Sequence, residues 1–156
     1  MGDKKWKILD IGCGNGDFLS KLDSSRVERY GIEINKRGCE MCLRRGLRAY
    51  NQELTNIDFQ DKKFDVITLW HVLEHTEKPM ELLNKIYQIL KKDGVLAFIT
   101  PNTDSFGFKW GKENWFHFWR LMWHFTTLCF LTEQSFKALI KGDLHKKIEW
   151  LFSSRA

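Results

Sequence analysis

Proline and long apolar runs are both scarce in this sequence. The chain has 156 residues and only two prolines, so no proline-rich linker divides it. No stretch reaches the roughly 18 apolar residues of a membrane-spanning helix, and there are no internal repeats. The start, MGDKKWKILDIG, has too few apolar residues for a secretory signal peptide. We therefore expect one domain over residues 1–156, in the cytoplasm.

Cysteines are few and do not form a metal-binding pattern. The four are Cys13, Cys39, Cys42 and Cys129. Cys39 and Cys42 form one C-x-x-C pair, but two thiolates alone do not complete a tetrahedral zinc site. Structural or surface thiols are the favoured interpretation, and a thioredoxin-like redox motif is the alternative.

The net charge of +5 is modest. Basic residues gather in residues 26–48 and again near the C-terminus. Such clusters can bind nucleic acid, but a solvated helix face explains them more often. We therefore expect no nucleic-acid partner.

Short β-branched or aromatic runs alternate with longer helical patterns, which predicts an α/β fold with a mostly parallel sheet. In the helix expected at 78–94, apolar residues recur at helical spacing and Gly94 occupies the position of a left-handed C-terminal residue. Ligands of such sheets bind beyond the carboxyl ends of the strands. Strands are expected at 6–12, 29–34, 47–52, 64–70, 95–101 and 146–154, and helices at 16–23, 35–46, 78–94 and 132–142.

A glycine-rich loop follows the first expected strand, in LDIGCGNGDF at residues 9–18. The dinucleotide fingerprint G-x-G-x-x-G, counted from Gly12, would need its third glycine at position 17. That position is Asp17, whose carboxylate would repel a pyrophosphate at the helix N-terminus, and Asp10 adds a second acid. A ligand with positive charge and no phosphate suits this loop better, and S-adenosylmethionine has both properties.

Together with the segments that follow it, the glycine loop resembles the class I S-adenosylmethionine-dependent methyltransferases, in particular the quinone-biosynthesis and small-molecule branch. ILDIGCGNGDFL resembles the first motif of that family, YGIEI the end of its second strand, and NQELTNIDFQDKKFDVITLWHVLEH its third and fourth motifs. ILKKDGVLAFITPNTDS resembles the helix and strand that follow. The resemblance covers about residues 6–106 and implies a three-layer, Rossmann-like sheet with S-adenosylmethionine as cofactor and S-adenosylhomocysteine as product.

The resemblance also implies the cofactor-binding residues. Glu33 would hold both ribose hydroxyls, Glu53 would lie near the adenine amino group, and the backbone of residues 69–71 would contact the methionine end. A surface acid beside Arg29 or Lys36 is the alternative for Glu33. The full expected set is Asp10, Gly12, Cys13, Gly14, Gly16, Glu33, Ile34, Gln52, Glu53, Leu54, Leu69, Trp70 and His71.

Histidines are the candidate catalytic groups, because a general base can assist transfer to a hydroxyl or amine. His75 and His124 are the candidates. His71, Glu74 and His75 form H-x-x-E-H, an order found in some zinc proteases. No third ligand is marked, so we expect no metal.

Residues 106–130 contain ten aromatic residues, four of them tryptophan. Ordinary packing, an acceptor pocket or partner contact, and weak contact with a membrane surface are the three interpretations. The family generally has helices before its first strand and a seventh, antiparallel strand. We find only six strands here, and expect the N-terminal lid and the last strand to be reduced or missing. A homodimer could complete the fold.

The favoured function is methyl transfer from S-adenosylmethionine to an O, N or C atom of a small molecule. The rival from another class is a non-catalytic module with a cofactor fold, which would act through its aromatic surface. An NAD-dependent oxidoreductase is the third interpretation, and Asp17 disfavours it.

Overall fold

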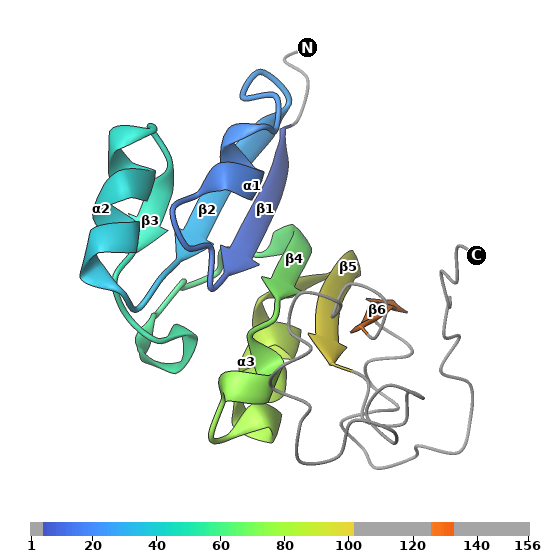
Figure 1. The fold of residues 1–156 in the computed structure, drawn as a ribbon. Helices are drawn as coiled ribbons and strands as arrows, with labels where there is room; N and C mark the ends of the chain where they lie inside the picture. The colour runs from blue at the N-terminus through green and yellow to red at the C-terminus, as the bar shows by residue number, and fades with distance from the viewer. Residues whose placement is uncertain (1–4, 102–125, 133–156) are drawn as a thin grey trace, which may run out of the picture.

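A six-stranded sheet forms the centre of the protein (Figure 1). This computed structural model describes residues 5–101 and the backbone of residues 126–132. The strands are β1 (Trp6–Ile11), β2 (Val27–Ile32), β3 (Arg48–Tyr50), β4 (Phe64–Trp70), β5 (Leu90–Pro101) and β6 (Thr126–Thr132). The helices are α1 (Asp17–Ser20), α2 (Lys36–Arg44) and α3 (Pro79–Ile89), with short 3-10 turns η1 (Leu54–Asn56) and η2 (Leu73–His75).

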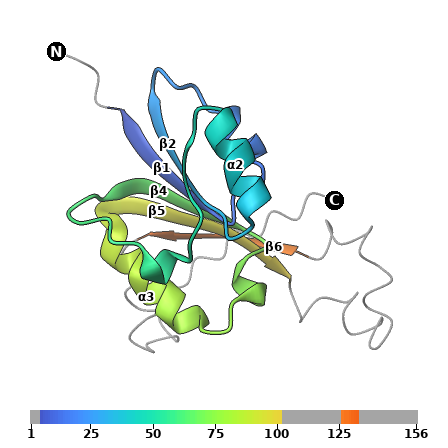
Figure 2. The ribbon, with the colours of Figure 1, turned by 90° about the vertical axis from the view of Figure 1, so that its left-hand side faces the viewer.

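The order of the strands creates a crevice at the carboxyl ends of the central strands. The order is β3-β2-β1-β4-β5-β6, and the first five of these in sequence run parallel. The chain moves outward from β1 to β3 and then returns to place β4 on the other side of β1. Right-handed crossovers therefore put α2 and α3 on opposite faces of the sheet, as Figure 2 shows. The three-layer, Rossmann-like prediction is confirmed, and the switch point lies between β1 and β4.

Two apolar clusters fill the space between the sheet and its helices. The larger one joins the central strands to α3 and includes Leu9, Phe64 and Ile86, each fully buried. The smaller one, on the α1 and α2 side, contains Cys13, Leu19, Cys42 and Leu47. Strands covered on both faces read as continuous apolar runs, which explains why β4 was recognisable from FDVITLW.

Local signals set the starts of the two longer helices. The Asn35 side chain accepts hydrogen bonds from the backbone N–H groups of Arg37 and Gly38, at 3.0 and 3.2 Å, and so caps α2. Pro79 occupies the first turn of α3, where a missing N–H costs nothing. No helix in the described part of the chain is long and apolar enough to cross a membrane.

The helix expected at 78–94 ends earlier than the sequence indicated. α3 stops at Ile89 and β5 begins at Leu90, so Gly94 lies within a strand and the predicted left-handed C-terminus there is wrong. Two contacts favour the strand. Leu90 pairs with Phe64 of β4, and Lys91 forms an ion pair with Asp65 at 2.5 Å.

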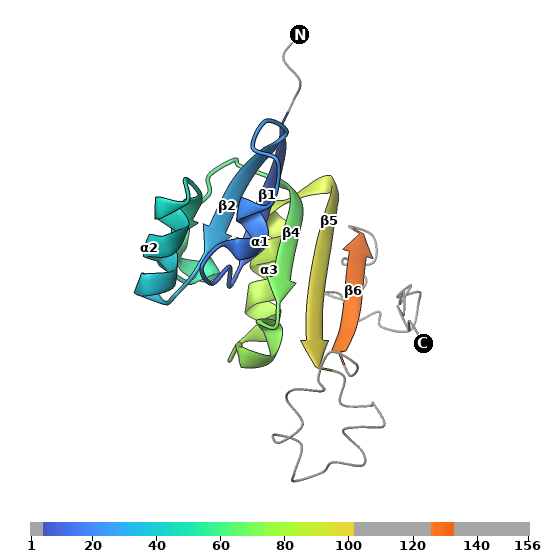
Figure 3. The ribbon, with the colours of Figure 1, turned by 45° about the horizontal axis from the view of Figure 1, so that its top comes forward.

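The sixth strand is not the one that the sequence suggested. β6 runs antiparallel to β5, with Pro101 opposite Thr126 and Val95 opposite Thr132 (Figure 3). Its first residues belong to the aromatic-rich segment 106–130, where we predicted no strand. The β-branched and apolar residues of TTLCFLT fit a strand, but the surrounding aromatic residues hid the pattern. The helix expected at 132–142 and the strand expected at 146–154 lie outside the described residues, apart from Thr132.

Candidate functional site

A cavity of about 720 Å³ opens at the carboxyl ends of the strands, beside the switch point between β1 and β4. This is the place where ligands of open α/β sheets bind. Its volume lies in the range of about 300–1,000 Å³ that is usual for small-molecule sites. The cavity is lined by Ile11, Gly12, Ile32, Glu33, Ile34, Glu53, Leu54, Thr55, Asn56, Trp70, His71, Val72, His75, Thr76, Glu77, Lys78, Glu81 and Leu82.

The glycine loop turns the chain sharply at the base of this cavity. The backbone N–H groups of Gly12 and Cys13 both donate to the Ile32 carbonyl, at 2.8 and 3.0 Å, and so tie the loop to β2. Gly12 has φ of 71°, and a Cβ there would lie 2.4 Å from Val72 Cγ2. Glycine is therefore required at position 12. A Cβ on Gly14 would meet nothing within 4 Å, so the loop faces open space at that residue.

Glu33 fixes the glycine loop from the tip of β2. Its Oε2 accepts a hydrogen bond from the Gly14 N–H at 2.8 Å, and its Oε1 accepts one from the Asn35 N–H at 2.7 Å. Each carboxylate oxygen can accept more than one bond, so the half-buried side chain can still receive hydroxyl groups from the cavity that it lines. Glu33 therefore positions the loop and presents negative charge to a ligand.

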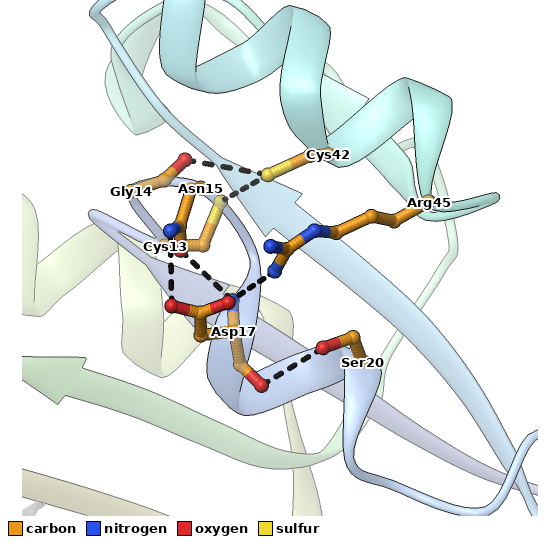
Figure 4. Close-up of polar contacts among 7 residues, drawn as sticks. All are labelled: Cys13, Gly14, Asn15, Asp17, Ser20, Cys42 and Arg45. Carbon is orange, nitrogen blue, oxygen red and sulfur yellow. Dashed lines mark hydrogen bonds and ion pairs between the residues drawn. The ribbon is translucent and has the colours of Figure 1, made fainter.

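The opposite side of the loop is held by α2 (Figure 4). The Cys42 thiol donates to the Gly14 carbonyl at 3.3 Å and contacts the Cys13 sulfur at 3.6 Å. Asp17 forms an ion pair with Arg45 and accepts from Asn15 Nδ2 at 2.9 Å. Arg45 directly follows α2 and caps its C-terminus, so the end of α2 and the start of α1 are joined across the loop.

The close fit between loop and helix depends on a residue that the sequence did not single out. A Cβ on Gly38, in the first turn of α2, would lie 2.9 Å from the Gly14 carbonyl oxygen and 3.0 Å from Glu33 Cγ. A side chain there would push the helix away from the loop.

The acidic residues that border the cavity differ from those that the sequence indicated. Asp10 is buried beneath the loop, where Thr68 Oγ1 donates to its Oδ1 at 2.6 Å, and burial raises its pKa to about 7. Asp17 is exposed, and its hydrogen bond with Arg45 lowers its pKa. Neither lines the cavity, so the structure does not place these two carboxylates at its wall as we had expected. The carboxylates that do line it are Glu33, Glu53, Glu77 and Glu81.

The cysteines form a structural cluster. Cys13, Cys39 and Cys42 are all free and buried. Cys42 shares a hydrogen bond with Cys13, which lies outside the C-x-x-C pair, and burial raises the pKa of all three thiols. Thiols of this kind are poor nucleophiles, which favours the structural interpretation over the redox one.

The end of β4 supplies the wall facing Glu33. Trp70 packs edge-on against Phe18 of α1, with ring centroids 5.4 Å apart. His71 follows with φ of 55°, a left-handed conformation that costs about 1–2 kcal/mol in a residue with a Cβ. Its N–H donates to the Ile99 carbonyl at 3.0 Å, and its Nδ1 lies 3.1 Å from Glu74 Oε1. Within the described residues, no group of three or more metal-ligating side chains occurs.

Eight of the residues expected to bind cofactor or to act in catalysis meet at this cavity. They are Gly12, Glu33, Ile34, Glu53, Leu54, Trp70, His71 and His75. Six other expected residues do not line the cavity: Asp10, Cys13, Gly14, Gly16, Gln52 and Leu69. Of these, Cys13 and Leu69 are buried and Gln52 is exposed. His124 lies outside the described residues.

The sequence reasoning missed the rim formed by η1 and the start of α3. Thr55, Asn56, Glu77, Lys78 and Glu81 line the cavity there. The position of a residue directly after a parallel strand could have indicated part of this rim. Residues between β4 and the next helix leave the sheet at the carboxyl ends of the strands, where ligands bind. Thr55 and Asn56 lie within the stretch NQELTNIDF that we had recognised but were not singled out, and Glu77, Lys78 and Glu81 belong to no recognised motif.

A parallel sheet that reverses its order beside a glycine loop, with a carboxylate at the tip of the adjoining strand, defines a Rossmann-like domain of the kind that binds nucleoside cofactors. Comparison with known proteins makes this specific. A family model described as a methyltransferase domain matches residues 2–142. The chain belongs to this family, among the class I S-adenosylmethionine-dependent methyltransferases.

Individual relatives agree with this assignment. The chain is 32% identical over 107 residues to the ubiquinone biosynthesis O-methyltransferase of Actinobacillus pleuropneumoniae, covering 62% of this chain and 46% of that protein. It is 30% identical over 112 residues to the enzyme of the same name from Pasteurella multocida, with the same coverage. The chain thus spans about half the length of the curated relatives it matches.

Solved structures show the same fold. The plantazolicin methyltransferase BpumL, in complex with a triazolic desmethylPZN analog and SAH, superposes with a TM-score of 0.59 at 25% identity, covering 64% of this chain and 40% of that one. A SAM-dependent methyltransferase from Thermotoga maritima gives a TM-score of 0.58 at 24% identity, covering 71% of this chain and 52% of that one. The latter similarity supports the fold alone.

Proposed function

We propose that this chain binds S-adenosylmethionine in the cavity at the β1–β4 switch point and transfers its methyl group to an O, N or C atom of a small molecule. The observation that carries the proposal is the pairing of Glu33 with the glycine loop at the wall of a 720 Å³ cavity. Membership of the methyltransferase domain family and the SAH held by the structural neighbour BpumL support it.

The residues present fit such a cofactor. Glu33 would accept hydrogen bonds from the ribose hydroxyls, and charge-assisted bonds of this type contribute about 1.5–3 kcal/mol each. Ile34 lines the cavity and is 71% exposed, so it offers an apolar surface for the adenine ring. Gly12 lines the cavity and carries no side chain, which leaves room for the methionine part beside the loop.

When bound, the cofactor would supply a methyl group on a positively charged sulfur, which leaves as a neutral thioether. The chain would mainly hold the acceptor about 3 Å from the methyl carbon and in line with the carbon–sulfur bond. Four glutamates, Glu33, Glu53, Glu77 and Glu81, and one lysine, Lys78, line the cavity, and Lys78 pairs with Glu81 at 3.3 Å. The lining therefore keeps a net negative charge, which favours a cationic ligand over a phosphate-bearing one. The acidic character inferred from the sequence thus still supports this cofactor, although different residues provide it.

Titration calorimetry tests the proposal directly. We expect S-adenosylhomocysteine to bind and NAD not to bind. Replacing Glu33 with alanine should weaken S-adenosylhomocysteine binding by about 2–4 kcal/mol, or roughly 30- to 1,000-fold. The matched control is Glu28→Ala at the other end of β2, where the carboxylate accepts from Tyr30 at 2.8 Å and lies away from the cavity. Equal affinities for the wild type and Glu33→Ala would remove Glu33 from the site.

Ligand binding and methyl-transfer assays would give different results for the two rival functions. Binding of NAD in preference to S-adenosylhomocysteine would favour the oxidoreductase. Tight binding of S-adenosylhomocysteine, with no methyl transfer across a broad panel of phenols, amines and thiols, would favour the non-catalytic module.

A further inference from the structure

The proposed function leaves open which group accepts the proton of the methyl acceptor. His75 was the candidate from the sequence, but within the described residues the histidine with an ordered carboxylate partner is His71. We propose that His71 is the general base for a hydroxyl acceptor and that Glu74 is the positioning residue that orients its ring. This inference rests on the proposed methyl transfer.

The backbone places His71 at the correct edge of the sheet. It directly follows β4, and its N–H donates to the Ile99 carbonyl at 3.0 Å, which extends the pairing between β4 and β5 by one residue. Its left-handed conformation, with φ of 55°, turns the chain sharply out of the strand. The next residues form η2, in which the His75 N–H donates to the Val72 carbonyl at 3.0 Å. The position of His71 is therefore set by backbone bonds on both sides.

The side chains then determine which ring nitrogen is available. Nδ1 of His71 lies 3.1 Å from Glu74 Oε1. The His71 side chain is 39% exposed and lines the cavity, whereas Glu74 is 21% exposed and does not line it. A carboxylate accepts and cannot donate when ionised, so the proton of the neutral ring lies on Nδ1. Nε2 is left unprotonated and able to accept a proton, the arrangement by which a carboxylate prepares a histidine base.

The proposed step transfers one proton to His71 and one methyl group to the acceptor oxygen. The proton of the acceptor O–H passes to Nε2 of His71 while the acceptor oxygen forms a bond to the methyl carbon. The carbon–sulfur bond breaks and its electron pair stays on sulfur. The products are the methyl ether, S-adenosylhomocysteine and a protonated His71 whose charge is balanced by Glu74. Water removes that proton before the next turnover.

His75 lacks these features. It also lines the cavity, but its position in η2 is set through its backbone N–H, and the described residues give its ring no hydrogen-bond partner. Without a partner, neither ring nitrogen is selected as the acceptor.

The first arm of the test is spectroscopic and independent of turnover. ¹⁵N-histidine NMR of the full chain, with and without S-adenosylhomocysteine, reports which ring nitrogen of His71 carries the proton. We expect the Nδ1–H form in the wild type and in Glu74→Gln, whose amide oxygen can still accept, and its loss in Glu74→Ala. A proton on Nε2 in the wild type would overturn the inference, whether or not S-adenosylhomocysteine binds.

The second arm uses 3,4-dihydroxybenzoate as a hydroxyl acceptor and follows release of S-adenosylhomocysteine. His71→Gln should lower kcat by roughly 10²- to 10⁴-fold, with the Kd for S-adenosylhomocysteine unchanged within twofold. Glu74→Ala should lower kcat and Glu74→Gln should restore part of it. A larger loss of kcat in His75→Gln than in His71→Gln would overturn the assignment. Failure of the wild type to bind S-adenosylhomocysteine would instead refute the proposed function.

Discussion

The buried Asp10 carboxyl should make the stability of the protein depend on pH in an unusual direction. Asp10 lies on β1 opposite Thr68 of β4, is 1% exposed, and has its pKa raised by burial from 3.8 to about 7. Between these two values the native protein binds a proton that the unfolded chain has released. The free energy of unfolding therefore falls as pH rises through this range, whereas a salt-bridged carboxylate would give the opposite slope.

The size of the effect follows from the pKa difference. About 3 pH units at 1.36 kcal/mol each correspond to about 4 kcal/mol lost between about pH 4 and pH 7. Replacing Asp10 with asparagine keeps an oxygen to accept from Thr68 Oγ1, which now donates at 2.6 Å, but removes the titration. We expect similar stability for the two proteins near pH 4, and an advantage of up to about 4 kcal/mol for Asp10→Asn at pH 8.

Urea unfolding at several pH values between 4 and 8, followed by tryptophan fluorescence, measures this difference. Other titrating groups contribute equally to both proteins, so the difference between the two curves isolates Asp10. Asp61→Asn, which removes an exposed carboxyl group before β4, is the matched control and should follow the wild type. The reasoning would be refuted if the difference in free energy of unfolding did not change with pH, or if the wild type became more stable relative to Asp10→Asn as pH rises.

Two further predictions concern the packing of α2 on the glycine loop and the cavity wall at Ile34. Gly38→Ala should destabilise the protein by up to about 2 kcal/mol, because about 1–3 kcal/mol of overpacking against the Gly14 carbonyl oxygen exceeds the gain of about 1 kcal/mol in helix propensity. Gly38→Ala should also weaken S-adenosylhomocysteine binding. The control Glu40→Ala, on the same helix, should change neither stability nor binding. If urea unfolding showed Gly38→Ala to be more stable than the wild type, the close fit between loop and helix would be contradicted. Ile34→Ala should weaken S-adenosylhomocysteine binding about 5- to 30-fold in calorimetry, through about 1–2 kcal/mol of lost apolar contact. Met41→Ala, an exposed apolar control outside the cavity, should bind normally, and equal losses in both variants would argue against an adenine site at Ile34.

Much of the parallel core could be read from the sequence. The strands β1 and β4 coincide closely with the runs WKILDIG and FDVITLW, and β2 begins only two residues before the expected range. Strands buried on both faces have continuous apolar runs, and glycines at a strand end mark a sharp turn. The glycine loop and Glu33 were found for the same reason, since these residues have local roles that need a particular side chain.

The boundaries that depend on distant partners could not be found in this way. α3 ends at Ile89 because Leu90 and Lys91 pair with residues of β4 some 26 positions earlier. β6 is a strand because β5 offers it an edge for antiparallel pairing, and no local pattern separated it from the aromatic residues before it.

What the sequence determined by itself was the fold class, the glycine loop and part of the set of residues that line the cavity at the carboxyl ends of the strands. Only the tertiary structure decided which acids face the cavity. Asp10 is buried between β1 and β4, and Arg45, directly after α2, pairs with Asp17, whereas Glu33 remains at the cavity wall. Sequence fixes the order in which charges occur along the chain, but solvent access and the proximity of a partner decide what each charge does, and both depend on segments far apart in the sequence.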